Sequence, residues 1–293
     1  MKIILMLISI LSMNSLTTGQ TGIFYPFGSD AGDVNNIGIE DENSTYVGLL
    51  SPFVFFGRMY HQIYINSNGH LTFNNPSSVF IPNSLPSNGS EDVIAALWTD
   101  IDISQNGNIS YQEYTTGSVL TQATQDINQY FPDLSFTATC VFVVTWDKVA
   151  YFYHTGTETS FQVVLISDGN LSFLLINYGD IAVSPNLVQG GYDTINSTHY
   201  FLIPESNNGS SISNLKYSSN VNVPGRWVFR VDGKADQNRE TVIGLQMRVI
   251  SYSDLAEIEN IAYVMEKIKQ ELVHQGLPSN VELNLRRVEK IKP

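Results

Sequence analysis

Two aspartates, Asp100 and Asp102, have the residue type and spacing that could do chemistry in this chain. They close the run 93–102, which is typical of one central strand, and residues two apart on a strand point to the same face. Such a pair could contribute the carboxylate oxygens that Ca²⁺ prefers. Further carboxylates for this site would come from the acidic loop near the N-terminus, at Asp30, Asp33 and Asp41. The alternative is a solvated acidic strand end without a metal.

Catalysis by the same carboxylates is a third hypothesis. Paired carboxylates could hydrolyse glycosides only with a raised pKa and a sugar cleft, and the sequence indicates neither. The sequence contains no metalloprotease, serine hydrolase or phosphate-loop motif. Its histidines are scattered without metal-ligand spacing, at His61, His70, His154, His199 and His274. We therefore expect a non-enzymatic protein without a cofactor, Ca²⁺ excepted.

Repeated turn signals predict the elements that must position these residues. The segments 63–73, 105–111 and 167–173 each contain Asn-Gly or Asp-Gly beside alternating apolar residues. We interpret them as hairpins, the first with a type I′ turn at Asn68-Gly69, because Asn and Gly accept positive φ. Three such hairpins predict an antiparallel β domain.

The remaining pattern supports a β-sandwich-like fold with one short helix. Further strands are expected at 47–56, 136–146, 161–167, 170–178 and 226–231, and a long loop at 21–46. Apolar residues recur every three or four positions from Leu120 to Phe131, which predicts a helix that ends before Pro132.

The first nineteen residues are typical of a secretory signal peptide, because a lysine precedes an apolar run and small residues follow. We therefore expect a secreted, extracellular protein without a membrane span. Its net charge of −13 lies before Lys234, which disfavours nucleic acid as a partner. Acceptor triplets for N-glycosylation occur at Asn43, Asn88, Asn108, Asn170, Asn196 and Asn208.

A single cysteine, Cys140, cannot form a disulfide within one chain. It lies in a strand-like run, so a buried apolar role is one interpretation. An intermolecular disulfide is the other.

Seven blocks occur in an order that resembles the nidogen-like (NIDO) domain family. The resemblance covers residues 24–233 and is carried by residues 25–28, 64–69, 97–102, 144–147, 161–169, 176–179 and 223–229. It implies an extracellular, mostly β module without known catalysis, which acts in cell-matrix adhesion. The implied partners are extracellular-matrix or cell-surface proteins or glycans. Cys140 departs from the family pattern, since a large aromatic residue is expected there.

Residues 234–293 have mixed charge and predict a separate strand-helix-strand unit. Strands are expected at 241–250 and 281–288, and a helix between them begins at the cap Asp254 and ends before Gly276. Two strands and one helix bury too little apolar surface to be stable alone. The unit therefore either docks on the β domain or forms a homodimer with its copy, and we predict that it mediates assembly.

These inferences divide the chain into a signal peptide at 1–19, a β domain at 20–233 and the unit at 234–293. The function that they favour is a secreted matrix or cell-matrix adhesion module that binds proteins or glycans. The alternative is a Ca²⁺-dependent, lectin-like binding module in which Asp100 and Asp102 hold the metal.

Overall fold

The computed structural model describes residues 22–36, 44–233 and 264–270. The chain divides into two compact units, residues 1–241 and 242–293. In the second unit, residues 264–270 are helical, within the helix expected after Asp254. The strands expected at 241–250 and 281–288 lie outside the described residues. The first unit contains the two described segments 22–36 and 44–233, which we call the β domain.

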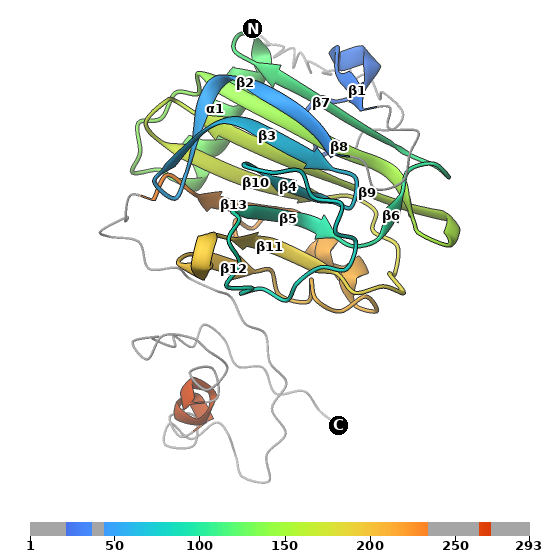
Figure 1. Ribbon diagram of the computed structural model, residues 1–293. Coiled ribbons are helices and arrows are strands. Elements are labelled where there is room, and N and C mark those ends of the chain that lie inside the picture. The colour runs from blue at the N-terminus through green and yellow to red at the C-terminus, as the bar shows by residue number, and fades with distance from the viewer. Residues whose placement is uncertain (1–21, 37–43, 234–263, 271–293) are drawn as a thin grey trace, which may run out of the picture. The chain divides into compact units, whose positions relative to one another are not determined.

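Thirteen described strands form two antiparallel sheets, which Figure 1 shows stacked face to face. The seven-stranded sheet has the order β1 (Val34–Asn36), β7 (Asn108–Tyr114), β8 (Cys140–Tyr151), β9 (His154–Ser167), β10 (Ser172–Tyr178) and β13 (Arg226–Arg230), and β6 (Ile101–Asp102) also pairs with β8. The six-stranded sheet has the order β12 (Tyr200–Leu202), β11 (Gln189–Asp193), β5 (Val93–Trp98), β4 (His70–Thr72), β3 (Arg58–Asn66) and β2 (Ser44–Phe55). The prediction of a mostly β, sandwich-like fold is confirmed.

The main core lies between the sheets, where alternate residues of both meet. Ile63 and Ile65 of β3 pack in the same cluster as Trp146 of β8 and Phe161 of β9. The Trp146 ring stacks on Phe161 with 4.9 Å between centroids, and its Nε1 donates to the Ser67 carbonyl at 3.1 Å. A buried indole thus has its single donor satisfied.

A second core covers the outer face of the seven-stranded sheet. The helix α1 (Ser118–Tyr130) buries Val119, Ala123 and Ile127 against residues of β8, β9 and β10. Strands β8 to β10 therefore have apolar neighbours on both faces, which explains their nearly continuous apolar sequences. Three short 3₁₀ helices complete the described elements: η1 (Ser29–Ala31), η2 (Ile195–Ser197) and η3 (Ile212–Tyr217).

The first expected hairpin exists, but its type I′ turn is wrong. Asn66 pairs with His70, so the loop has three residues, and Asn68 is not among those with positive φ. Gly69 alone of the Asn68-Gly69 pair has a left-handed φ, 78°, and its N–H donates to the Asn66 carbonyl at 3.2 Å. A type I turn followed by a left-handed glycine is the usual three-residue hairpin loop.

The second expected hairpin, around Asn106-Gly107, is wrong as well. Asp102 pairs with Ala150 and Asn108 with Asp147, so β6 and β7 lie one after the other along β8. Residues 103–107 form the loop that connects these two strands, both of which pair with β8. The third hairpin is confirmed, with Ser167 of β9 paired to Ser172 of β10.

The run 93–102 is two strands and not one. Strand β5 ends at Trp98 in the six-stranded sheet, and β6 begins at Ile101 in the other sheet. The expected strand at 136–146 likewise begins later, at Cys140, and continues to Tyr151. Both shifts reflect pairing partners that are distant in sequence and leave no local pattern.

Candidate functional site

The crossover between the sheets, residues 97–101, is fastened to the Asn68-Gly69 turn. Three backbone N–H groups of the crossover donate to it: Leu97 to the Gly69 carbonyl at 3.0 Å, Thr99 to the Asn68 carbonyl at 3.1 Å and Ile101 to Asn68 Oδ1 at 2.9 Å. A Cβ on Gly69 would lie 2.1 Å from the Leu97 oxygen. Two of the sequence blocks that resemble the family, 64–69 and 97–102, are therefore hydrogen-bonded to each other. We call this contact between the crossover and the Asn68-Gly69 turn the joint.

Three consecutive residues of the crossover also hold three separate loops. Trp98 Nε1 donates to the Val79 carbonyl at 2.7 Å, and Thr99 Oγ1 donates to the Leu187 carbonyl at 2.8 Å. The Asp100 carbonyl accepts the Phe152 N–H at 3.1 Å. The joint thus positions one end of the sandwich.

His70 lies inside this joint as a fully buried, neutral ring. It stacks on Trp98 with 4.3 Å between ring centroids, and its Nδ1 is 3.5 Å from the Asn68 carbonyl oxygen. Its Nε2 has no hydrogen-bond partner among the described residues. Burial lowers the pKa of His70 from 6.5 to about 3. A group held neutral in this way is suited to packing.

The structure separates the two aspartates that the sequence placed on one strand face. Asp100 lies in the crossover, whereas Asp102 lies in β6 and is only 6% exposed. Asp102 Oδ1 accepts hydrogen bonds from the Ser104 N–H at 2.9 Å and the Ser104 hydroxyl at 2.5 Å. The alternative of a solvated strand end is therefore wrong for Asp102. Its carboxylate instead accepts hydrogen bonds from the loop that follows β6.

The other expected Ca²⁺ ligands have different surroundings. Asp33 Oδ2 accepts hydrogen bonds from the Gly28 N–H at 2.8 Å and the Ser110 hydroxyl at 2.7 Å, and burial raises the pKa of this carboxyl. Asp41 lies outside the described residues. Within the described ranges no three His, Cys, Asp or Glu side chains come together as a metal site. Ca²⁺ binding at Asp100 and Asp102 stays a prediction, and calorimetric titration of the protein with Ca²⁺ tests it.

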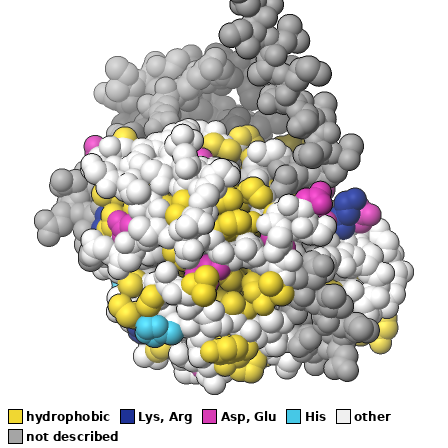
Figure 2. All heavy atoms as spheres, turned by 90° about the horizontal axis from the view of Figure 1, so that it is seen from above, with side chains coloured by type: hydrophobic (Ala, Val, Ile, Leu, Met, Phe, Trp, Pro, Cys, Tyr) yellow, Lys and Arg dark blue, Asp and Glu magenta, His cyan; other side chains and the backbone are white. Residues whose placement is uncertain are grey.

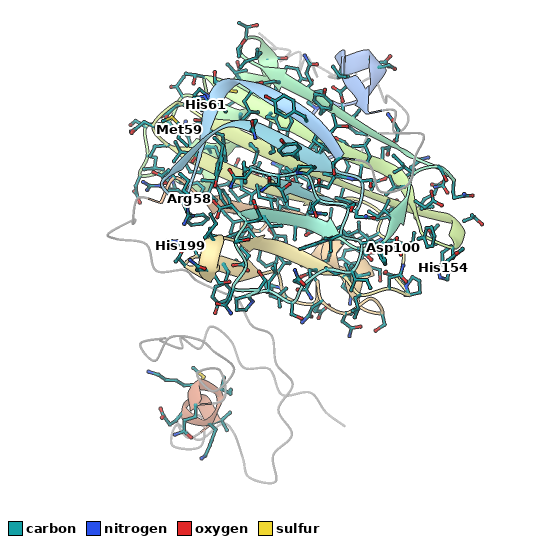
Figure 3. All side chains as sticks on the ribbon, viewed as in Figure 1. Arg58, Met59, His61, Asp100, His154 and His199 are labelled. Atoms are coloured by element: carbon teal, nitrogen blue, oxygen red, sulfur yellow. The ribbon has the colours of Figure 1, made fainter. Side chains whose placement is uncertain are left out.

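The three histidines labelled in Figure 3 do not lie close to one another. Figure 3 shows His154 beside the end that carries Asp100, and His61 and His199 at the opposite end of the β domain. His274 lies outside the described residues. This arrangement offers no shared catalytic base among the labelled side chains.

Cys140 is 7% exposed and faces Glu113 of β7, with 3.1 Å between Sγ and Oε1. Burial and this carboxylate raise the pKa of the thiol to about 12. Because thiolate is the form that exchanges disulfides, these surroundings favour the buried apolar role. An intermolecular disulfide at Cys140 stays a prediction.

The expected loop at 21–46 is wrong at η1, at β1 and at the first residues of β2, whereas residues 23–27 have no helix or strand but are hydrogen-bonded to the seven-stranded sheet. Tyr25 exchanges two hydrogen bonds with the Gln162 side chain, at 2.8 and 3.0 Å, and its hydroxyl donates to Asp126 at 2.8 Å. Arg226 donates to Asp126 at 3.0 Å and to the Ile23 carbonyl. This partly buried ion pair holds the segment against the sheet.

Five of the six glycan acceptors lie in described residues, and all five side chains are exposed: Asn88, Asn108, Asn170, Asn196 and Asn208. Asn43 lies outside them. Two acceptor loops adjoin each other, since the Asn88 N–H donates to Ser197 Oγ at 2.8 Å. The positions are accessible to glycan, and their occupancy stays a prediction.

The outer face of the six-stranded sheet is covered on one side only. Leu85 of the 73–92 loop packs on Ala95 and Trp98 of β5. The loop reaches β2 at its first residue, where Ser44 Oγ donates to the Ser77 carbonyl at 3.2 Å. The loop also contacts β3, where Gln62 donates to the Phe73 carbonyl and Arg58 pairs with Asp92. Among the described residues, the outer side of these two strands is bare at Tyr46 and Leu50 of β2 and at Met59 of β3.

We call the bare part the β2–β3 face and define it by Tyr46, Leu50, Met59 and Tyr64. Tyr46 is 58% exposed, Leu50 71% and Met59 60%, and the Tyr46 and Tyr64 rings meet edge to face at 5.7 Å. Figure 2 looks from above at the end of the β domain where Figure 1 labels β2, and it shows hydrophobic side chains on that surface. Exposed apolar groups of this extent mark interaction sites more often than plain solvent-facing surface.

The β2–β3 face is not among the sites expected from the sequence. The sequence contains one indication of an exposed apolar strand here. Residues 44–49 lack the charged residues and prolines that commonly occur in edge strands. The pattern could not show that this strand would lie at an edge of its sheet.

Comparisons with known proteins find a family match that contains six of the seven blocks and begins after residues 25–28. The family described as "Nidogen-like domain" matches residues 61–233. Mouse alpha-tectorin is 36% identical over 229 residues, which are 72% of this chain and 10% of that protein. Drosophila melanogaster nidogen is 32% identical over 65% of this chain and 15% of its own length, and mouse nidogen-2 is 24% identical over 92% of this chain and 21% of its own length.

The chain thus spans about a tenth of the length of the alpha-tectorins that it matches. No solved structure matches it significantly. Among the described residues, no helix is long and apolar enough to cross a membrane.

Proposed function

The chain belongs to the nidogen-like domain family, and from this membership we propose that it is a secreted, non-enzymatic module of the extracellular matrix. It acts by binding a matrix or cell-surface partner, in the manner expected of cell-matrix adhesion. The observation that carries the proposal is the family match, which spans most of the β domain.

Two features of the β domain support this proposal. The five described glycan acceptors are exposed, as a glycoprotein of the secretory pathway requires. The motif residues at the crossover hold loops and strands together by backbone hydrogen bonds. A scaffold that presents a binding surface needs such joints.

Expression of the full chain in cultured animal cells tests export. We expect the protein in the medium, with a mobility that increases after treatment with an N-glycosidase. Recovery only in the cell lysate, without glycan, would overturn the proposal.

Solid-phase binding tests the adhesive role. The purified protein is titrated on decellularised extracellular matrix, with albumin-coated wells as the control surface. We expect saturable binding to the matrix that exceeds binding to albumin. Equal signals on both surfaces would show that the protein has no matrix partner in that preparation and would count against adhesion.

A further inference from the structure

A small pocket lies on the β domain where the N-terminal segment 23–27 meets strands β8 and β9. Two rings of that segment, Phe24 and Phe27, form its apolar wall, with 5.8 Å between their centroids. The other lining residues come from β8, from β9 and from the loop after β10: Asp147, Lys148, Glu158, Ser160 and Asp180. The pocket volume is about 70 Å³. One water needs roughly 10–15 Å³, and a drug-sized molecule needs roughly 300–1,000 Å³, so the pocket has room for the end of one side chain.

Strand β8 is irregular where it lines this pocket. Its pairing with β9 shifts register between Trp146 and Val149, so residues 147–148 form a β-bulge. Lys148 has a left-handed φ of 52°, a conformation that residues other than glycine seldom adopt. A bulge changes the direction of the side chains that it contains, and bulges are frequent beside binding sites. Here the bulge contributes Asp147 and Lys148 to the pocket.

The Asn106-Gly107 pair, expected from the sequence to turn a hairpin, holds this bulge instead. Asn106 Nδ2 donates to the Lys148 carbonyl at 2.5 Å and to the Thr157 carbonyl at 3.0 Å. A Cβ on Gly107 would lie 2.6 Å from the Lys148 carbonyl oxygen, so only glycine permits this close approach. The backbone on one side of the pocket is therefore fixed before any ligand binds.

Asp147 is the pocket carboxylate that has no ion pair among the described residues. Glu158 pairs with Lys148 at 3.7 Å, and Asp180 pairs with Lys216 at 3.2 Å. Burial raises the pKa of the Asp147 carboxyl, although Lys148 is its neighbour. A partly desolvated carboxylate in these surroundings gains stability from a cation that enters the pocket.

The geometry favours lysine over arginine as the source of this cation. The Ser160 hydroxyl donates to Asp147 Oδ1 at 3.2 Å, which leaves Oδ2 for a ligand. A guanidinium binds a carboxylate best through two parallel hydrogen bonds, whereas an ammonium is a compact point charge. An ammonium beside Phe24 and Phe27 also gains cation–π attraction. At longer range, the described β domain attracts cations, because it contains sixteen Asp or Glu and only five Lys or Arg.

We propose that this pocket binds the ammonium group of one lysine side chain of a partner protein. The ammonium donates a hydrogen bond to Asp147 Oδ2, and the lysine methylenes pack on Phe24 and Phe27. Glu158 and Asp180 add attraction at the same site. This inference rests on the proposed function, since it names the residue by which an adhesion module would recognise its partner.

Saturation-transfer difference NMR on the full chain tests the inference, because this method detects weakly bound small probes. The probe is Nα-acetyl-lysine amide. Its two controls are the norleucine analogue, which lacks the ammonium, and the arginine analogue. We expect transfer to the lysine side-chain methylenes to be roughly tenfold stronger than transfer to norleucine, since a hydrogen bond to a charged group is lost. Transfer to arginine should also be weaker than transfer to lysine.

Protein variants locate the binding. Asp147→Asn removes the charge, while its amide oxygen can still accept the Ser160 hydroxyl, and it should lower transfer to the lysine probe roughly tenfold. Asp133→Asn is the matched control, because Asp133 is exposed and does not line the pocket. Phe27→Leu retains an apolar side chain without the ring and should lower transfer roughly two- to fivefold. A thermal melt of each variant verifies that it folds, and Phe27→Leu still tests the site if Asp147→Asn does not fold.

Several results would overturn the inference. Equal transfer to lysine and norleucine would exclude recognition of the ammonium, and stronger transfer to arginine would assign the pocket to a guanidinium. Equal losses in Asp147→Asn and Asp133→Asn would show that diffuse negative charge attracts the probe.

Binding to decellularised matrix separates this inference from the proposed function. Asp147→Asn should bind the matrix more weakly than the native protein and Asp133→Asn do. If Asp147→Asn binds the matrix as the native protein does, the lysine pocket fails as the adhesive contact while the proposed function stands. If the native protein binds the lysine probe but not the matrix, the proposed function fails while the pocket stands.

Discussion

Acidification is expected to destabilise the β domain through His70. The ring is fully buried, stacks on Trp98 at 4.3 Å between centroids, and has no described partner for Nε2. A proton on this ring would place a charge that is closed off from solvent and that no described carboxylate hydrogen-bonds. The folded state therefore resists protonation, whereas the unfolded chain accepts the proton at the ordinary pKa.

The size of the effect follows from the two pKa values. The pKa of His70 is about 3 in the folded protein against 6.5 for the free side chain. Because the folded pKa is lowered, the stability that a neutral His70 contributes is full above pH 6.5 and declines as the pH falls toward 3. Linkage predicts a loss of about 2 kcal/mol between pH 7 and pH 5. For a domain of this size that corresponds to a decrease of roughly 4–8 °C in Tm.

Urea unfolding followed by tryptophan fluorescence at pH 7, 6 and 5 measures this loss. His70→Phe retains an aromatic ring beside Trp98 but cannot titrate, so its stability should change about 2 kcal/mol less than that of the native protein over this interval. His61→Gln is the matched control, since His61 is exposed on the neighbouring strand β3. It should follow the native pH dependence.

Comparison with His70→Phe removes the contributions of other groups. Burial raises the pKa values of Asp33 and Asp147, and these carboxyls change stability in the opposite direction on acidification, equally in both proteins. Parallel pH profiles for the native protein and His70→Phe would refute the reasoning. A profile flattened equally by His61→Gln would refute the assignment to His70.

Three further perturbations have expected outcomes. Arg226→Met leaves the partly buried Asp126 without its cation and should cost about 3 kcal/mol in urea unfolding. Lys216→Met removes an exposed ion pair and should change stability little. Equal effects of the two substitutions would contradict the burial argument. Gly69→Ala places a Cβ 2.1 Å from a backbone oxygen of the crossover and should be clearly less stable than Gly169→Ala, which has a similar positive φ and open space around it. Maleimide should label native Cys140 roughly a thousandfold more slowly at pH 8 than a free thiol, because its pKa is about 12 rather than 9; fast labelling of the native protein would contradict this environment.

Local patterns in the sequence determined the elements whose signals lie within a few residues. The helix from Ser118 to Tyr130 is visible in its apolar spacing, and its buried residues include Ala123 and Ile127 as expected. The β9–β10 hairpin is visible in Asp168-Gly169, because a left-handed glycine permits the turn wherever the sheet lies. The apolar runs of the central strands likewise predicted burial, since strands covered on both faces need apolar residues at every position.

Only the tertiary structure decided which strands pair and what lies beside each side chain. Asp100 and Asp102 are two residues apart, yet the chain changes sheets just before Asp102, so a spacing that predicts a shared face on one strand predicted nothing here. The apolar residues of β2 have the same alternation as a core strand, and Tyr46 is exposed only because β2 has an edge position and the 73–92 loop stops at Ser44. Pairing partners and covering loops come from distant parts of the chain, and their contact energies leave no trace in the local sequence.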